Sequence, residues 1–555
     1  MSERIFGSAF SRRRFLKVSA LTSGAFFINT KFNHMRLADV PTSPYTTPWS
    51  QPLAFAEYAT PLPAFAQLDP LPELSNFQRY DEFPAAHQYN IKVCEALHCA
   101  HPQLAFCPHT TYNGTAPGPT FMMRYGRPVI TRFENCMPAV MPAYGSCDVI
   151  THVHNGNHAP QSDGGPWDYF SPGNYHDHHW ANVCSTDTTT GLPDPREAKG
   201  TLFYHDHCHD FTGANVYRGL AGFFLLFDNL DSGNENDTNP EAFRLPSGVP
   251  DGKRVKNRYD IPIVLADRNY DQNGMLLYDS LNMDGLLGDK NLVNGRVQPY
   301  FEVERRKYRF RILNSGISRF HDVWFSNGMT FQYIANDGNM ITTPMELQHV
   351  KLGVAERADI VIDFSQLPAS TTEIYLVNRA EQVNGRGPTG NTVPMSQAPK
   401  LLKLIIRPAT GVVDNSRVPT TLRQLPEMNL PVARTRNWHF NRTNGMWTVN
   451  GQLFDENRCD ALCKHGTAEI WNFSTAGGWA HPVHNHVEEP RYLSLNGKSV
   501  EGTTIQARKD AHPLYPGDEI SVYIKFRDWI GRYPMHCHNL IHEDHAMMFR
   551  WDMEA

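Results

Sequence analysis

The chain has 555 residues, with 51 Lys and Arg against 57 Asp and Glu, and a formal net charge of −6. A chain of this length is too long for a single hydrophobic core and corresponds to about three to four domains. The mild charge, with no basic run outside the N-terminus, argues against nucleic acid as a partner and favours small-molecule substrates. The 40 prolines, 39 glycines and many short apolar runs predict strands and turns, so we expect a mostly β protein.

The N-terminus reads as an export signal. Residues 11–17, Ser-Arg-Arg-Arg-Phe-Leu-Lys, precede an apolar run of about eleven residues, which is too short to span a bilayer. Arg12 and Arg13, followed by Phe15, resemble the twin-arginine signal. We therefore expect the twin-arginine export machinery as a partner and a bacterial periplasmic or extracellular location. Residues 1–40 are assigned to this signal and its lead-in, and we predict no stable membrane span.

The ten cysteines suit an oxidising compartment in which some of them pair. Cys94, Cys99 and Cys107 are close in sequence, as are Cys459 and Cys463. Neither group has the tight paired spacing of metal ligands. We expect disulfides or inert buried thiols there rather than a metal site.

Strand-like apolar runs divide the chain into three predicted domains, which span residues 75–230, 258–408 and 435–555. A charged, asparagine-rich linker separates the first two, and a loop with several prolines separates the last two. The histidines of the second domain, His321 and His349, are isolated. We therefore expect this domain to serve as a scaffold.

Four His-x-His pairs occur in the first and third predicted domains. The pairs are His152/His154, His205/His207, His484/His486 and His536/His538. On a strand, side chains two residues apart point to the same face, so each pair presents two imidazoles to one site. One such pair is weak evidence, but four together predict a metal cluster. We expect the histidines within residues 176–179 and His209 to lie in loops or around the ligands.

Cys537 separates the two histidines of the last pair and therefore points to the opposite face of its strand. His542 and Met547 follow on a predicted loop. A thiolate, an imidazole and a thioether are soft ligands typical of an electron-transfer copper centre, which needs a second histidine. His481 supplies it, because it lies an odd number of positions from His484 and faces the other side. One strand thus serves two metal sites.

These residues resemble the ligand set of the multicopper oxidases of the three-domain laccase type, with the closest motif match to bilirubin oxidases and spore-coat-type bacterial laccases. The resemblance covers nearly the whole chain after the signal. Its most specific part is residues 536–548, His-Cys-His-Asn-Leu-Ile-His-Glu-Asp-His-Ala-Met-Met. Other matching segments are Tyr112-Asn-Gly, Pro117-Gly-Pro-Thr, Arg305-Arg-Lys-Tyr-Arg-Phe-Arg, Ala355-Glu-Arg-Ala-Asp and Trp479. The resemblance implies an all-β fold of three consecutive cupredoxin-like Greek-key domains.

The resemblance also implies four coppers. The implied ligands of the type 1 copper are His481, Cys537, His542 and, axially, Met547. Those of the type 2 copper are His152 and His484. Those of the type 3 pair are His154, His205, His207, His486, His536 and His538. In the family, one-electron donors are oxidised at the type 1 copper and O2 is reduced to water at the other three.

The implied enzyme is a copper-dependent oxidoreductase that uses oxygen to oxidise diphenols and related phenolic, aromatic amine or bilirubin-like donors. We expect it to be a monomer. Cys537 links the two kinds of site, and two acidic residues match carboxylates that the family places near the cluster. Asp163 lies eleven positions after His152, and Glu543 directly follows His542. A carboxylate within reach is a natural proton carrier, so both are assigned catalytic roles. The alternative for Glu543 is a solvated surface carboxylate.

The residues after His486 depart from the family. Glu488 and Glu489 stand where apolar residues are usual, which predicts either a carboxylate-lined donor site that favours cationic amines and metal ions or two solvated glutamates. Two alternatives to a phenol oxidase follow: oxidation of a metal ion such as Mn or Cu, and a copper-free structural protein of this fold. The complete ligand set argues against the last, and the lack of a methionine-rich insert argues against copper oxidation.

Overall fold

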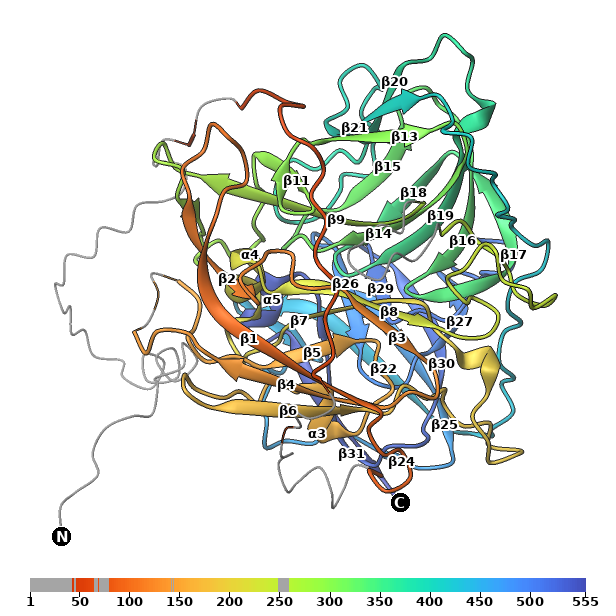
Figure 1. Cartoon of the computed structure of the whole chain (residues 1–555). Coiled ribbons are helices and arrows are strands. Elements are labelled where there is room, and N and C mark those ends of the chain that lie inside the picture. Colours follow the sequence, from red (N-terminus) through yellow and green to blue (C-terminus); the bar gives the residue numbers. More distant parts are fainter. Residues whose placement is uncertain are drawn as a thin grey trace, which may run out of the picture.

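The computed structural model describes residues 42–43, 46–63, 68, 79–140, 142, 144–247 and 259–555. The export signal predicted over residues 1–40 lies outside the described residues. This part of the chain consists mainly of strands with a few short helices, so the predicted all-β class is confirmed. None of its helices has the length and apolar character needed to cross a membrane. The strands form three sandwiches, each with two sheets around its own hydrophobic core (Figure 1).

The first sandwich comprises β1 to β8. One sheet has the order β2-β1-β4-β6, with β1 (His87–His98), β2 (Cys107–Tyr112), β4 (Val129–Asn135) and β6 (Tyr175–Trp180). The other has the order β3-β8-β7-β5, with β3 (Phe121–Arg124), β5 (Thr151–His154), β7 (Thr201–Asp206) and β8 (Ala221–Phe227). Its helical segments are α3 (Pro160–Asp163), η2 (Pro195–Glu197) and α4 (Thr212–Arg218). Aromatic side chains such as Phe133 and Tyr204 fill the space between the sheets.

The second sandwich comprises β9 to β21 and the 3-10 turn η3 (Phe364–Gln366). Its larger sheet has the order β12-β11-β9-β14-β19-β16-β17, with β10 paired to β9. The strands are β9 (Asp260–Tyr270), β10 (Leu276–Leu277), β11 (Lys290–Val293), β12 (Arg296–Val297), β14 (Lys307–Asn314), β16 (Phe331–Asn336), β17 (Asn339–Leu347) and β19 (Arg357–Asp363). Its smaller sheet has the order β13-β21-β20-β15-β18. The strands are β13 (Tyr300–Glu304), β15 (His321–Phe325), β18 (His349–Leu352), β20 (Glu373–Asn378) and β21 (Lys400–Arg407).

The third sandwich comprises β22 to β32 and helix α5 (Leu540–Asp544). One sheet has the order β23-β22-β25-β30-β27-β28, with β22 (Val432–Thr443), β23 (Met446–Val449), β25 (Ala468–Thr475), β27 (Arg491–Leu495), β28 (Lys498–Ser499) and β30 (Glu519–Lys525). The other has the order β24-β32-β31-β26-β29, with β24 (Ala461–Lys464), β26 (His481–Asn485), β29 (Ala511–Leu514), β31 (Gly531–Cys537) and β32 (Met548–Glu554). β22 begins ahead of the predicted boundary at residue 435, and the domain limits themselves stay predictions.

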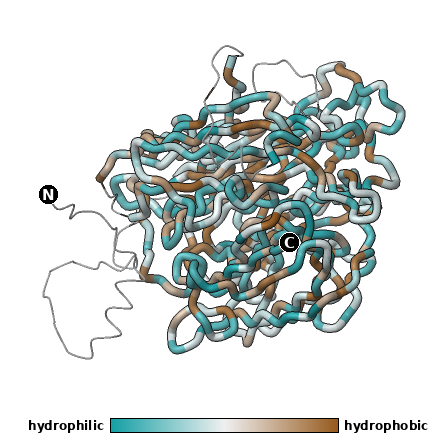
Figure 2. Tube along the Cα trace, turned by 90° about the horizontal axis from the view of Figure 1, so that it is seen from below, coloured by the Kyte–Doolittle hydropathy of each residue, from teal (hydrophilic) through white to brown (hydrophobic). Residues whose placement is uncertain are grey.

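The same topology occurs three times. In one sheet of each sandwich a parallel pair joins two strands: β1 with β4, β9 with β14, and β22 with β25. In the other sheet a second parallel pair joins the first and last strands: β3 with β8, β13 with β21, and β24 with β32. Figure 2 shows apolar segments inside the body and polar residues along the outer loops. Each sandwich thus buries its own core in the same way.

Shared cores and buried ion pairs join the sandwiches. Tyr217 from the first, Tyr270 from the second and Leu540 from the third pack in one apolar cluster. Arg311 in the second sandwich is fully buried, and its Nη1 donates to Thr201 Oγ1 of β7 at 2.7 Å. Such contacts hold β7 and α5, the two elements next to the histidine pairs, in fixed positions.

Candidate metal centres

Two pairs of neighbouring strands position the histidines. In the first sandwich β5 and β7 run antiparallel, with His152 opposite His205. In the third, β26 and β31 run antiparallel, with His484 opposite His536. Because cross-strand partners point to the same face, each sandwich presents its histidines as one patch. The two patches meet, and all eight rings of the four pairs are buried between the first and third sandwiches.

The prediction that each pair lies on a strand is correct only in part. Both members of the first pair lie on β5, but His207, His486 and His538 directly follow the last residues of β7, β26 and β31. The chain bends after these strands, and Val487 adopts a left-handed φ of 58°. The second histidines of three pairs therefore reach the cluster from strand ends.

The eight rings meet in three groups, with ring nitrogens pointing toward one another. His152 and His484 place their Nε2 atoms 3.4 Å apart. In the second group, His536 Nε2 lies 3.1 Å from His207 Nε2 and 3.2 Å from His486 Nε2. These separations suit ligands that share a metal ion.

The third group contains the remaining histidines. His154 Nδ1 lies 3.4 Å from His205 Nε2, and the ring centre of His538 lies 5.1 Å from each of their ring centres. Both ring nitrogens of His538 are buried and have no hydrogen-bond partner in the described part of the chain. Every group combines residues of both sandwiches, so the cluster exists only while the first and third sandwiches are in contact.

Burial keeps seven of the eight imidazoles neutral. Desolvation lowers the pKa of seven of the eight, and repulsion between neighbouring protonated rings lowers it further. They are His152, His154, His205, His207, His484, His486 and His538. For His205 and His207 the pKa falls to about 3. A neutral imidazole has a ring lone pair available for a metal ion.

Asp163, at the end of α3, connects the two sandwiches. Its backbone oxygen accepts a hydrogen bond from His152 Nδ1 at 2.6 Å, and its Oδ2 accepts one from His486 Nδ1 at 2.7 Å. The other carboxylate oxygen, Oδ1, is buried and has no hydrogen-bond partner among the described residues. Burial raises the pKa of this carboxyl well above its usual range. The structure therefore places Asp163 beside the cluster, with one oxygen to spare.

Asp510 makes the corresponding contacts from the third sandwich. Its backbone oxygen accepts from His484 Nδ1 at 2.9 Å, and its Oδ1 accepts from His154 Nε2 at 2.8 Å. Arg357 of β19 holds the same carboxylate with two hydrogen bonds, Nη1 to Oδ1 at 2.7 Å and Nη2 to Oδ2 at 2.6 Å. Sequence reasoning missed Asp510, and its only local sign is its place at the end of the charged run of residues 508–510. Arg357 lies in the family segment at 355–359 but had no assigned role.

Glu543 is buried, 4% exposed, so the alternative of a surface carboxylate is wrong. It lies in the short helix α5, whose first turn is capped by the Asn539 side chain. Its Oε2 lies 2.9 Å from His536 Nδ1, and its Oε1 lies 3.7 Å from His207 Nδ1. Like the two aspartates, Glu543 contacts one histidine of each sandwich, which fixes the rings' orientation.

A second ligand group lies on the opposite face of β31, inside the third sandwich. His481 Nδ1 and His542 Nδ1 are 3.1 Å apart, and Cys537 Sγ lies 3.5 and 3.6 Å from them. Three atoms with this spacing lie about 2 Å from their common centre, which is the length of a metal–nitrogen bond. The predicted alternation around Cys537 is therefore what the structure shows.

The loop after Cys537 closes this group. Met547 donates its backbone N–H to the His542 oxygen at 3.0 Å and accepts from the Cys537 N–H at 3.0 Å. Its side chain is fully buried in the same hydrophobic core as Cys537. The indole of Trp447 lies 3.8 Å from the His542 ring, centre to centre, and covers it. The group is thus dry and rigid.

The donors present fit copper. Two imidazoles and a thiolate in a triangle, with a thioether nearby, are the ligands of a blue electron-transfer copper site. The three histidine groups offer neutral nitrogens whose opposite ring nitrogens are mostly held by oxygen acceptors, as metal-binding histidines require. In the described chain, the histidine groups and the thiolate group are joined through residues 536–538.

Other polar residues named from the sequence lie elsewhere. His178 Nδ1 donates to the Ser162 oxygen at 2.9 Å. This histidine of β6 therefore fixes α3 and does not bind a metal. Glu488 and Glu489 are 2% and 7% exposed, so both alternatives, a carboxylate-lined donor site and two solvated glutamates, are wrong. Arg527 pairs with Glu488 at 3.0 Å, and Arg508 with Glu489 at 3.1 Å. A sequence does not show such distant partners.

The two clusters of cysteines away from Cys537 are thiols, not disulfides. Cys94, Cys99, Cys107, Cys459 and Cys463 are all unbonded to another sulfur. No metal-binding group of the described residues includes them. The expectation of disulfides is therefore wrong, and that of buried thiols holds for Cys107 and Cys463 but not for the exposed Cys459.

Comparison with known proteins agrees with this ligand geometry. Two family models, both described as multicopper oxidase, match residues 260–395 and 426–554. Over 545 residues the chain is 29% identical to a bilirubin oxidase of Albifimbria verrucaria, covering 95% of this chain and 88% of that protein. It is also 29% identical to a laccase of Bacillus stratosphericus, covering 87% of this chain and 98% of that protein.

The chain belongs to the multicopper oxidase family.

Solved structures of the family share the fold. A laccase from Pediococcus acidilactici matches with a TM-score of 0.72 at 22% identity, covering 93% of this chain and 96% of that one. A multicopper oxidase from Aquifex aeolicus matches with a TM-score of 0.70 at 23% identity, covering 85% and 97%. The predicted fold of three consecutive cupredoxin-like domains is confirmed, each sandwich being one such domain. Membership makes the chain a copper-dependent oxidoreductase by family.

The Arg357–Asp510 contact leads to a testable prediction. Arg357→Met leaves the Asp510 carboxylate buried without its guanidinium, which we expect to cost roughly 3–5 kcal/mol of stability. Because Asp510 orients His154 and His484, the variant should also lose copper from the histidine groups. The thiolate absorption should persist. Copper analysis after dialysis, together with absorption spectra, measures both effects.

Arg309→Met is the matched control. Arg309 is equally buried and pairs with Asp231 at 2.8 Å, but it does not contact the cluster. It should lower stability while retaining copper. Equal copper content in the two variants would contradict a positioning role for Arg357.

Proposed function

We propose that this protein is an exported bacterial oxidase of the laccase and bilirubin oxidase type. It takes single electrons from phenolic, aromatic amine or bilirubin-like donors and reduces O2 to water. The observation that carries the proposal is that residues 536–538 contribute Cys537 to the thiolate group and the two neighbouring histidines to two groups of the histidine cluster. The names of the relatives, bilirubin oxidase and laccase, support the same donor classes.

The proposed holoenzyme has four coppers. One would be held by His481, Cys537 and His542 with Met547 nearby, and one by His152 and His484. The other two would be held by the groups His207, His486 and His536, and His154, His205 and His538. Bound copper supplies the redox chemistry, accepting electrons singly from donors and delivering four to oxygen.

The chain itself connects the two sites. Cys537 is one peptide unit from His536 and one from His538, so a covalent path runs between the groups. Cys537 is fully buried, and the sandwich core around it excludes water. Donor binding and oxygen binding are therefore kept apart but linked through a few bonds.

The donor site lies where His542 approaches the surface. His542 Nε2 lies 3.3 Å from the backbone oxygen of Asp284. The Asp284 carboxylate accepts from Trp479 Nε1 at 3.1 Å and pairs with Arg386 at 2.9 Å and Arg442 at 3.3 Å. These four surface residues form the proposed donor mouth.

The charge of the donor mouth favours anionic or neutral aromatic donors. Two guanidinium groups, of Arg386 and Arg442, lie 4.8 and 5.7 Å from the Trp479 ring centre. Only one carboxylate accompanies these two guanidinium groups, so the net charge of the donor mouth is positive. A positive charge attracts acidic aromatics and repels metal cations. This favours bilirubin-like dicarboxylates over Mn or Cu ions.

Protons for oxygen reduction require a carrier at the cluster. Asp163 Oδ1 is free of hydrogen bonds within the described chain while Oδ2 holds His486. Glu543 lies on the other side, against His536. We propose Asp163 as the proton carrier from the first sandwich and Glu543 as that from α5.

Copper analysis tests the proposal directly. The purified protein should contain about four coppers per chain and show blue absorption from the thiolate site, and Cys537→Ser should lose that colour together with donor oxidation. The histidine groups should still bind copper, because their ligands are untouched. A protein without copper, or with blue colour surviving Cys537→Ser, would contradict the assignment.

The donor preference is tested with Arg386→Gln/Arg442→Gln. Removing two positive charges should raise KM for bilirubin about tenfold while leaving KM for a neutral phenol nearly unchanged. Steady-state rates on bilirubin, a phenol, an aminophenol and Mn(II) measure this. Arg407→Gln, which removes an exposed arginine paired with Glu302, is the control. Equal changes for both donors would argue against charge selection.

Asp163→Asn tests the proton carrier. The amide keeps the shape of the side chain but cannot carry a carboxyl proton, so kcat should fall roughly 10²-fold with the blue absorption intact. Asp168→Asn, which removes a nearby carboxylate paired with Arg532 at 3.5 Å, should leave kcat unchanged. Loss of colour in Asp163→Asn would instead indicate a structural role.

A further inference from the structure

A cleft between the second and third sandwiches has no role in the proposed function. It consists of two neighbouring cavities of about 340 and 280 Å³ that share Lys351 and Tyr515 as lining residues. Lys351 lies on β18, the edge strand of the second sandwich, and Tyr515 directly follows β29, an edge strand of the third. Cavities of this size between domains are common sites for small ligands.

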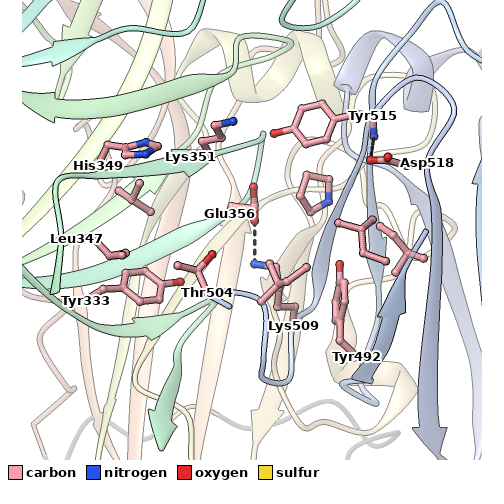
Figure 3. A pocket seen from close by; sticks show the side chains of 15 residues that line it. Tyr333, Leu347, His349, Lys351, Glu356, Tyr492, Thr504, Lys509, Tyr515 and Asp518 are labelled. Atoms are coloured by element: carbon pink, nitrogen blue, oxygen red, sulfur yellow. Dashed lines mark hydrogen bonds and ion pairs between the residues drawn. The ribbon is translucent and has the colours of Figure 1, made fainter. Parts of the chain in front are cut away.

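The charged groups at the smaller cavity are already paired with one another. Lys509 is buried, and its Nζ lies 2.8 Å from Asp337 Oδ2 and 2.8 Å from Glu356 Oε1. Figure 3 shows the contact with Glu356. The hydroxyl of Tyr492 is bound to His512 Nδ1 at 2.9 Å. These groups form a polar wall that does not need a ligand to complete it.

Lys351 is exposed at the rim of both cavities, and its ammonium makes no ion pair with any residue that the structure describes. The nearest carboxylate in register is Asp322, opposite Lys351 on β15, and its Oδ1 is bound by His349 Nδ1 at 2.5 Å. In Figure 3 the Tyr515 hydroxyl points toward Lys351 across the cleft. An ammonium and a phenolic hydroxyl at the junction of two cavities offer two donors to one anionic group.

The larger cavity has a mixed lining in which aromatic rings and prolines lie beside polar residues and one imidazole without a hydrogen-bond partner. Phe320 and Tyr515 line it with ring centres 5.8 Å apart, together with Pro388 and Pro516. His321 also lines it, is 2% exposed, and has both ring nitrogens buried without a hydrogen-bond partner in the described structure. A buried polar group without a partner is costly, and a ligand with a polar atom would satisfy it.

The cleft is connected to the donor mouth by one loop. Residues 388–392 line the larger cavity. In the same loop, Arg386 pairs with Asp284, and its backbone oxygen accepts from the Ala480 N–H, one residue before His481, at 2.7 Å. At its start, Arg379 donates its N–H to the Asp322 oxygen at 2.8 Å. A molecule in the larger cavity would therefore contact the loop that carries part of the donor mouth.

We propose that this cleft binds a small aromatic carboxylate, with the acid group at Lys351 and Tyr515 and the ring in the larger cavity beside His321 and Phe320. The site is separate from the donor mouth, and its occupant changes donor binding through the loop of residues 379–393. The binding itself does not depend on the proposed oxidase function, whereas the effect on donor binding rests on it.

The probe is benzoate, which has an acid group and a ring but no phenol to be oxidised. Calorimetric titration into the copper-loaded full chain should show binding. Lys351→Met should weaken it about tenfold, the loss of one charge-assisted contact. Lys498→Met, at an exposed lysine of β28, should leave it unchanged. Benzamide, the neutral analogue, should bind both the wild type and Lys351→Met equally weakly.

His321→Leu is the second variant, and unchanged blue absorption would show that it folds. It should leave benzoate binding nearly unchanged, because benzoate has no polar ring atom for the imidazole, but it should remove the extra affinity expected for nicotinate, whose ring nitrogen can accept a hydrogen bond from His321. Equal benzoate affinity in the wild type and Lys351→Met, or no binding at all, would overturn the proposal. Loss of binding in Arg386→Gln/Arg442→Gln would place benzoate at the donor mouth instead. If benzoate binds as expected but KM for a phenol does not change, only the link to the donor mouth fails.

Discussion

Hydrogen bonds that cross from one sandwich to the other are the interaction on which the rest of the structure depends. Eight imidazoles have little reason to gather in a dry interface, because each has polar nitrogens to satisfy. Asp163, Asp510 and Glu543 each bind or contact one histidine from the first sandwich and one from the third. Ring orientation and the contact between sandwiches are thereby fixed together.

Asp163 and Asp510 make the same kinds of contact with histidines, but their carboxylates have different neighbours. Each uses its backbone oxygen for a histidine of its own sandwich and its carboxylate for one of the other. Arg357 binds both carboxylate oxygens of Asp510, so Asp510 can only position its histidines. Asp163 keeps an oxygen without a hydrogen bond in the described structure, so it can also carry a proton. The same arrangement therefore occurs twice: Asp510 only positions histidines, whereas Asp163 can also carry a proton.

The second sandwich is therefore more than a scaffold. Its histidines are outside the metal groups, as the isolated His321 and His349 predicted. Yet β19 supplies Arg357, which fixes the cluster through Asp510, and the loop after β20 supplies Arg386 to the donor mouth. Both contacts are made across sandwich boundaries by residues that have no distinctive spacing in the sequence.

This explains how much could be predicted. The four His-x-His pairs and the opposite faces of Cys537 and its neighbours follow from the two-residue period of a strand, and the structure gathers these histidines in one cluster with Cys537 facing the other way. The positions of His207, His486 and His538 beyond the ends of their strands do not follow from this period, because the alternation of side chains does not predict where a strand ends. Asp510, and the burial of Glu488 and Glu489, depend on arginines far away in the sequence, which no local pattern indicates.

The three copies of one topology show why the fold suits two kinds of site. Cys537 points into the core of its own sandwich, where apolar packing encloses the thiolate group. His536, one residue away, points to the outer face, where only contact with another sandwich can bury it. A single sandwich can thus enclose an electron-entry site, but the histidine cluster needs two. The separation of the thiolate group from the histidine cluster, and with it the proposed division between donor oxidation and oxygen reduction, follows from the two faces of one strand.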